Sequence, residues 1–171
     1  MPSNLVVISP AFVDNGFIPV KFTGQGANIS PPLIIENISG NVKSIAIIMD
    51  DPDAPMRVFT HWLIWNIPAE ISILPEGIPN EAIVYSLGGA VQGTNDFGKL
   101  GYGGPLPPIG QLHTYRIKVY ALDAFLPAIA GIGKLALENE LNGHIVQFGV
   151  LRGKYMLENY GMQACSMIKF Y

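Results

Sequence analysis

Apolar residues occur along the chain in short runs, and most of these runs end near Gly, Pro or Asn. Val, Ile, Phe and Tyr dominate the runs, which is the pattern of β-strands separated by turns. Several runs are apolar on both faces, which indicates central strands that meet water on neither side. The clearest runs cover residues 5–9, 44–50, 61–67, 82–87 and 114–122. The pattern predicts a mainly β fold.

Residues 134–157 have a different spacing, with apolar positions at Leu137, Leu141, Ile145, Phe148 and Leu151. Steps of three and four residues are typical of a helix. We expect Asn142 and Gly143 to split or bend this helix and Gly153 to end it, because Gly is costly inside a helix. The closing residues 166–171 favour a last strand.

The longest segment without regular periodicity covers residues 88–112 and is rich in Gly and Pro. Loops of this length inside a compact domain are more often functional than idle. Its prolines make the segment stiff, and its glycines let the backbone approach a ligand closely. The segment leads directly into His113.

The composition indicates one globular domain over residues 1–171, since 49% of the residues are apolar and only 13% are charged. The net charge of −3 and the absence of a basic run exclude a non-specific nucleic-acid binder. The sequence shows neither a signal peptide nor an apolar stretch long enough to cross a membrane. We therefore expect a soluble cytoplasmic protein. The single cysteine, Cys165, has no internal disulfide partner and is expected to be a small buried apolar residue.

Three aspartates and two prolines lie within residues 50–55, directly after an apolar run. Asp51 and Asp53 flank Pro52, which makes the segment a rigid turn. His61 then opens the next apolar run, and a buried histidine needs a hydrogen-bond partner for each ring nitrogen. A nearby aspartate would supply one partner and raise the basicity of the ring. In the alternative interpretation, the aspartates only cap turns.

His113 stands in the same relation to the run at 114–122, and alternation places His113 and Tyr115 on one face of that strand. If this face meets His61, two imidazoles, a phenol and an Asp converge beside the Gly/Pro loop. Such a set suits a small anion, which would be bound by histidine, tyrosine and backbone N–H donors. Two core histidines with separate partners remain an alternative. His144, on the expected helix, has no partner that the sequence names and is interpreted as structural.

Other chemistry is weakly supported by the sequence. Asp51, His61 and His113 could act together as metal ligands, but their spacing matches no short metal-binding signature. Neither a serine-nucleophile elbow nor a nucleotide-binding loop is present. We therefore expect no metal and no cofactor.

Two segments resemble the signature regions of the phosphatidylethanolamine-binding protein (PEBP) family. The first is DPDAP at 51–55 followed by HWLIWNIP at 61–68, and the second is GYGGPLPPIGQLHTYRIKVYALD at 101–123. Residues 18–33 and NDFG at 95–98 resemble the bacterial and archaeal branch, whose members are called Raf kinase inhibitor-like proteins. The resemblance runs from about residue 17 to the end.

The resemblance implies a two-sheet Greek-key β-sandwich with a few peripheral helices and a small preformed pocket for phosphate-like or carboxylate anions, such as a phospholipid headgroup. Carried over residue by residue, the ligand-binding set is Asp51, His61, Gly104, Pro105, Pro107, His113 and Tyr115. Asp53 would support the turn, and Trp62 and Tyr102 would form walls.

This chain departs from the family pattern at two places. Thr114 stands where many relatives have an arginine, which puts any function of that cation in doubt. Few residues separate DPDAP from His61, and this short rim puts in doubt the partner specificity of eukaryotic relatives, including binding to Raf-type kinases.

The leading functional interpretation is a binding protein for a phosphorylated or otherwise anionic ligand that regulates a protein partner. An anion beside Asp51 would need a protonated histidine, so binding should weaken as pH rises past the histidine pKa. A second interpretation is an inhibitor of a protease or kinase that acts through loop 88–112. A third is a weak hydrolase with His61 or His113 as general base and Asp51 as its orienting partner. The sequence leaves open the natural ligand, the protein partner and whether the chain forms a homodimer.

Overall fold

The computed structural model describes residues 4–158 and contains two β-sheets in that range. The smaller sheet has the order β1-β3-β6, and the larger has the order β2-β10-β9-β4-β5-β8-β7. The small sheet is formed by β1 (Val6–Ile8), β3 (Leu33–Glu36) and β6 (Ile73–Leu74). The edge strands of the large sheet are β2 (Gly16–Phe17) and β7 (Ile83–Val84), and β8 (Ala90–Gln92) lies between β5 and β7. Short 3₁₀ turns cover Val20–Phe22 and Tyr85–Leu87.

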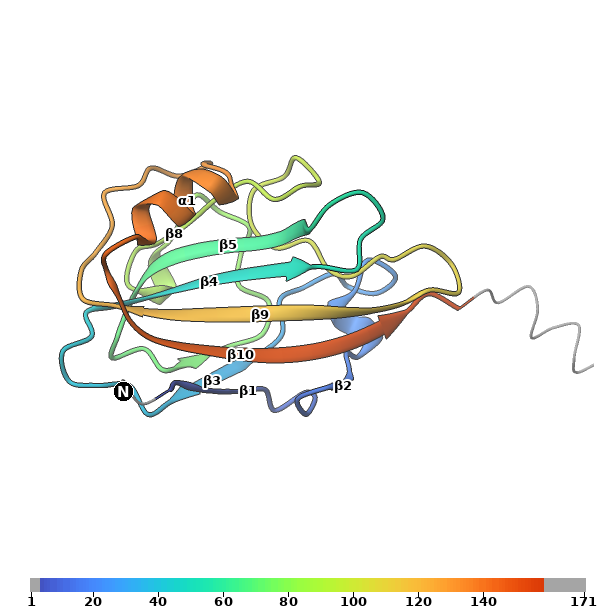
Figure 1. The fold of residues 1–171 in the computed structure, drawn as a ribbon, viewed down its shortest axis with the longest axis horizontal. Coiled ribbons are helices and arrows are strands. Elements are labelled where there is room, and N and C mark those ends of the chain that lie inside the picture. The colour runs from blue at the N-terminus through green and yellow to red at the C-terminus, as the bar shows by residue number, and fades with distance from the viewer. Residues whose placement is uncertain (1–3, 159–171) are drawn as a thin grey trace, which may run out of the picture.

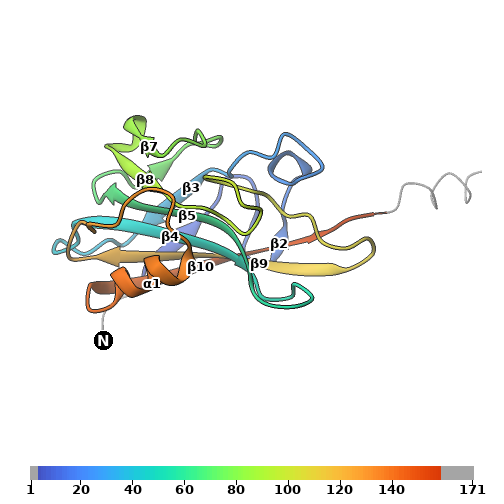
Figure 2. The same cartoon turned by 90° about the horizontal axis from the view of Figure 1, so that it is seen from above.

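Four long antiparallel strands form the centre of the large sheet: β4 (Ser44–Asp51), β5 (Phe59–Pro68), β9 (Leu112–Leu122) and β10 (Ile145–Met156). All eight residues of β4 are buried, because both faces of the sheet are covered. Figure 1 shows these strands side by side, and Figure 2 shows α1 (Lys134–Leu141) and β3 on opposite faces.

Alternation along β4 divides its side chains between two apolar cores. Ile45, Ile47 and Met49 belong to the larger core, which also takes in residues of the small sheet. Ala46 and Ile48 belong to a smaller core that includes Leu137 and Leu141 of α1. The same alternation separates the two acids at the end of the strand, so that the side chains of Asp50 and Asp51 point to opposite faces of the sheet.

Asp50 is fully buried and is surrounded by cations. Its carboxylate accepts from Arg116 at 2.7 and 3.0 Å and lies 2.7 Å from the Lys118 ammonium and 3.2 Å from the Lys134 ammonium. Burial alone would raise the pKa of Asp50, but the hydrogen bonds from Arg116 and Lys118 outweigh it and hold that pKa below its ordinary value. This cluster ties the beginning of α1 to β4 and β9.

The prediction of a mainly β, two-sheet fold is confirmed, and the strands expected at 5–9, 44–50, 61–67 and 114–122 are present within a few residues of their predicted ends. The run at 82–87 is a strand only at Ile83–Val84 and continues as a 3₁₀ turn. The segment 88–112 is irregular except for β8 near its beginning and the first residue of β9 at its end.

The helix predicted for 134–157 is wrong in its second half. The helix ends at Leu141, and Asn142 and Gly143 lead into β10 instead of a second helical turn. In β10 the buried positions are 147, 149, 151, 153 and 155, so the true period is two. Two of these positions, 149 and 153, are glycines, which do not count as apolar residues in a sequence pattern. The apolar residues that remain lie three and four residues apart, which resembles a helix.

The strand expected at 166–171 and Cys165 lie outside the described residues. Between residues 4 and 158, no helix is both long and apolar enough to span a membrane.

Candidate functional site

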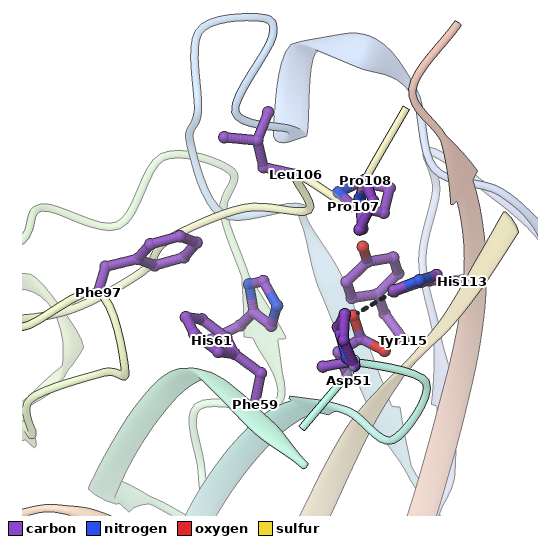
Figure 3. Close-up of a pocket in the computed structure, with 11 residues that line it drawn as sticks. Asp51, Phe59, His61, Phe97, Leu106, Pro107, Pro108, His113 and Tyr115 are labelled. Carbon is purple, nitrogen blue, oxygen red and sulfur yellow. Dashed lines mark hydrogen bonds and ion pairs between the residues drawn. The ribbon is translucent and has the colours of Figure 1, made fainter. Parts of the chain in front are cut away.

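Three central strands of the large sheet, β4, β5 and β9, begin or end close together on one side of the molecule. Because β4 runs antiparallel to β5 and β9, the end of β4 lies near the start of both: Asp51 pairs with Phe59 of β5, and Asp50 pairs with Arg116 of β9. A cavity of about 350 Å³ opens there (Figure 3). We call it the Asp51 cavity, and its lining consists of Asp51, Ala54, Pro55, Phe59, His61, Phe97, Leu106, Pro107, Pro108, His113 and Tyr115.

Asp51 forms a buried pair with His113. The His113 Nδ1 lies 2.7 Å from the Asp51 Oδ2, and both side chains are almost fully buried. The Nε2 of the same ring lies 3.2 Å from the Gln111 Oε1. The two ring nitrogens of His113 thus each face an oxygen atom. The sequence pointed to His61 as the partner of Asp51, and this expectation is wrong.

His61 instead points its Nδ1 at the backbone carbonyl oxygen of Gly103, 2.6 Å away. A carbonyl can only accept, so Nδ1 carries the proton, and in the neutral ring Nε2 holds the lone pair. Burial is the main cause that lowers the pKa of His61, against the opposing effect of the Gly103 hydrogen bond and the Asp51 charge.

A shift in strand register gives His61 its position. Met49 pairs with Trp62, whereas Asp50 pairs with Thr60, so His61 is the extra residue of a β-bulge. Bulges re-aim side chains and are common beside functional sites. This bulge brings the His61 ring to 5.2 Å from the Tyr115 ring, centroid to centroid.

Tyr115 occupies the floor of the Asp51 cavity between the two histidines, and Figure 3 shows its hydroxyl directed toward Pro107. The residue is only 1% exposed, and its hydroxyl has no hydrogen-bond partner among the described residues. Burial, with smaller effects of the neighbouring Asp51 carboxylate, raises the pKa of this phenol, although the two groups do not reach the geometry of a hydrogen bond. It therefore remains a neutral O–H that can donate.

Apolar and aromatic side chains form the opposite wall. The Phe97 ring packs 4.8 Å from Phe59 and 5.5 Å from His61, measured between centroids. Asp96 holds this turn in place, because its carboxylate accepts from the Thr60 N–H at 2.7 Å and its own N–H donates to the Thr60 carbonyl. A ligand in the cavity would thus meet a few polar groups on one side and rings on the other.

The structure brings five of the predicted ligand-binding residues to the Asp51 cavity: Asp51, His61, Pro107, His113 and Tyr115. The other two, Gly104 and Pro105, are buried and are not part of the lining. Trp62 and Tyr102 also do not line it. They pack edge to face with each other, and their polar atoms bond to Gln92 and to the Phe22 carbonyl.

Asp53 lies at the turn rather than in the cavity. Its N–H donates to the Asp51 Oδ1 at 2.9 Å, and its carboxylate accepts from the Thr114 N–H at 2.8 Å. These two bonds connect the turn after β4 to the start of β9. They hold Asp51 where His113 can reach it.

Six lining residues were not predicted: Ala54, Pro55, Phe59, Phe97, Leu106 and Pro108. Phe59 could have been found, because it lies two residues before His61 at the mouth of the same strand. Phe97 lay in the NDFG segment, whose turn gave no indication of its distance from β5. The remaining four are apolar residues of loops, for which the sequence carries no positional signal.

His144 lies in the turn after α1, and its Nδ1 is 2.8 Å from the Asp123 Oδ1 in an exposed pair. The sequence named no partner for His144 and placed it on a helix; the structure gives it Asp123 as a partner and places it after the helix. Residues 4–158 contain no cluster of His, Cys, Asp and Glu that could hold a metal ion.

Comparisons with known proteins identify relatives of this chain. The model of the family described as "phosphatidylethanolamine-binding protein" matches residues 8–156. A UPF0098 protein of Pyrococcus horikoshii is 50% identical over 149 residues, which cover 86% of this chain and 75% of the relative. Among solved structures, a PEBP homologue from Chlamydia trachomatis is 35% identical with a TM-score of 0.80, over 89% of this chain and 97% of that one.

A further solved structure, that of YbcL from E. coli, a member of the mammalian PEBP family, is 30% identical with a TM-score of 0.83. The match covers 91% of this chain and 99% of that one. With a family match over most of the chain and a half-identical archaeal relative, the chain belongs to the phosphatidylethanolamine-binding protein family.

Proposed function

We propose that this protein binds small anions of the phosphate class, including phosphorylated headgroups, in the Asp51 cavity. The observation that carries the proposal is the Tyr115 hydroxyl, which is buried at the cavity floor without a partner among residues 4–158. A buried hydroxyl without a hydrogen bond costs about 1–3 kcal/mol. A ligand oxygen that accepts from Tyr115 would recover that cost.

The charges of the cavity support an anion bound together with a proton. Asp51 supplies negative charge that would repel a phosphate, and only a protonated histidine can offset it from within the lining. His113 already faces two oxygens, and His61 would gain an Nε2 donor on protonation. The bound anion would in turn favour the imidazolium, so anion binding and proton uptake should be linked.

Calorimetric titration with sulfate tests this proposal. Sulfate remains a dianion between about pH 5 and pH 8, so any pH dependence in that range reports the histidines and not the ligand. We expect binding at the acidic end that weakens progressively as pH rises. Affinity that does not change with pH would contradict the proposed imidazolium, and absence of binding throughout would refute the anion site.

A matched pair of histidine variants locates the site. His61→Gln keeps an N–H donor for the Gly103 carbonyl but cannot take up a proton, so it should lose the pH dependence that is due to His61. His144→Gln removes an exposed histidine far from the cavity and should bind like the wild-type protein. Equal losses in the two variants would show that sulfate binds elsewhere.

A second candidate function is inhibition of a protease or kinase through loop 88–112. Leu106, Ile109 and Leu112, which lie in this segment, are about half exposed or more, and Leu106 also lines the cavity. Such exposed apolar residues favour contact with a protein. Inhibition of this kind should persist when Tyr115 is replaced by Phe, whereas regulation through the bound anion should not.

A further inference from the structure

A second cavity of about 360 Å³ adjoins the Asp51 cavity and shares two of its walls, Phe97 and Leu106. We call it the Lys99 cavity. Its lining consists of Gly24, Asn28, Asn80, Asn95, Phe97, Lys99, Tyr102, Gly103, Gly104 and Leu106. None of its polar residues belongs to the Asp51 cavity, so the two compartments differ in chemistry.

Asparagine side chains hold the backbone that forms the Lys99 cavity. The Asn28 Oδ1 accepts from the Gly104 N–H at 2.7 Å, and the Asn80 Oδ1 accepts from the Tyr102 N–H at 3.0 Å. The Asn95 Oδ1 accepts from the N–H groups of Phe97 and Lys99. The walls are thus fixed before any ligand arrives, which lowers the entropic cost of binding.

The loop glycines leave no room for a side chain at this wall. A Cβ at Gly104 would lie 2.4 Å from the Phe22 carbonyl oxygen, and a Cβ at Gly103 would lie 2.6 Å from the Phe97 ring. The Gly103 carbonyl also accepts from the His61 Nδ1, so one peptide separates the two cavities.

The free donors of the Lys99 cavity suit a polar, negatively charged group. Lys99 is the one charged residue of the lining, is exposed at the cavity mouth, and makes no ion pair within residues 4–158. The Asn28 Nδ2 donates to no other described residue. An ammonium group would be repelled by Lys99, whereas hydroxyls and a second anion would find donors.

The size of the compartments points to a ligand larger than one phosphate. Small-molecule sites usually measure about 300–1,000 Å³, and each cavity alone reaches the lower end of that range. Phe97 and Leu106, which lie between them, are 43% and 49% exposed. The chain of a ligand could pass over these two side chains and remain partly covered.

We propose that the Lys99 cavity is a second subsite that binds the hydroxylated and negatively charged end of a phosphorylated polyol or sugar, while its first phosphate occupies the Asp51 cavity. This inference rests on the proposed function of the Asp51 cavity. The expected ligand has a phosphate at one end and a second anion at the other, joined by carbons that carry hydroxyls.

Two sugar phosphates that differ in one phosphate test the subsite. Fructose 1,6-bisphosphate should bind the wild-type protein about fivefold more tightly than fructose 6-phosphate, as one partly exposed charge pair allows. Phosphorylethanolamine, whose second group is an ammonium, should show no such gain. Calorimetry at an acidic pH, where the histidines favour anions, would measure all three.

Variants of the second cavity then assign the gain. Lys99→Gln removes the charge, and Asn28→Asp keeps the Oδ1 acceptor for Gly104 while adding a negative charge. Asp also tolerates the left-handed backbone at this position, where φ is 57°. Both variants should abolish the preference for the bisphosphate and leave sulfate affinity within about twofold of wild type. Lys43→Gln, at the far end of β4, is the matched control and should retain the preference.

Three results would overturn the subsite. If sulfate binds but both sugar phosphates bind equally, the second cavity takes no anion and the proposed function stands. If the preference survives in Lys99→Gln and Asn28→Asp, the second phosphate lies elsewhere. If sulfate does not bind at all, the proposed function and this inference fail together.

Discussion

At the scale of single residues, the buried Tyr115 hydroxyl lowers the stability of the free protein because it lacks a hydrogen bond. A ligand that supplies this hydrogen bond would gain binding free energy. The hydroxyl contributes no hydrogen bond within the described residues and lies where a ligand oxygen would reach it. Residues that pack without satisfying their polar atoms are uncommon in native proteins, and they call for a functional explanation.

Replacing Tyr115 with Phe should therefore separate stability from binding. The free energy of unfolding should stay the same or rise by up to about 1 kcal/mol, because an unpaired buried hydroxyl is removed. Sulfate affinity should fall roughly tenfold, since about 1.5 kcal/mol from a hydrogen bond to a charged group is lost. Urea denaturation and calorimetry measure the two quantities. Loss of stability together with unchanged affinity would contradict this role for Tyr115.

How far the site residues could be predicted also depends on single positions. Alternation alone placed His113 and Tyr115 on one face, and the structure places both in the Asp51 cavity. His61 could not be paired correctly, because the bulge that re-aims it depends on a register between β4 and β5 that one strand cannot encode. The sequence favoured His61 as the partner of Asp51, and only the tertiary arrangement shows that His113 is the partner.

At the scale of elements, β10 shows why apolar spacing can mislead. Its inward positions at 149 and 153 are glycines because neighbouring segments cross directly over them. A Cβ at Gly149 would lie 2.7 Å from the Leu5 carbonyl oxygen, and one at Gly153 would lie 2.4 Å from the Ile18 side chain. The four strands correctly predicted at 5–9, 44–50, 61–67 and 114–122 needed no such information, since their own apolar side chains gave the signal.

The close approach at Gly153 predicts a clear cost of substitution. Gly153→Ala should lower the free energy of unfolding by about 1–3 kcal/mol, because a methyl group is forced into an already filled core. Gly40→Ala is the matched control, because nothing lies within 4 Å of its added Cβ. The control should unfold at nearly the wild-type urea concentration. Equal midpoints for the two variants would contradict the packing described for β10.

At the scale of the whole molecule, stability should depend on pH through His61. In the unfolded chain its ring takes up a proton near pH 6.5, whereas burial lowers its pKa in the folded protein. The unfolded state thus binds more protons below about pH 6.5, and the free energy of unfolding falls as pH decreases from there toward the lower folded pKa. Asp50, whose folded pKa is also lowered, keeps its contribution until below about pH 4.

Thermal unfolding between about pH 5 and pH 8 checks this linkage. His61→Gln should show a smaller loss of Tm on acidification than the wild-type protein, and His144→Gln should show the wild-type loss. Sulfate should protect the wild-type protein most at the acidic end, because bound anion and bound proton favour each other. A His61→Gln profile identical to that of the wild type would contradict the assignment to His61.

The two neighbouring acids of β4 also bear on how this sequence can change over generations. Asp50 pairs with the cations near α1, whereas Asp51 pairs with His113 in the cavity. The two acids point to opposite faces only because side chains alternate along the strand. A slip of one residue would exchange the faces of all its side chains. Selection should therefore tolerate gains and losses of residues around the exposed Met56, beyond the bonds of Asp53, while rejecting any change of length within β4 itself.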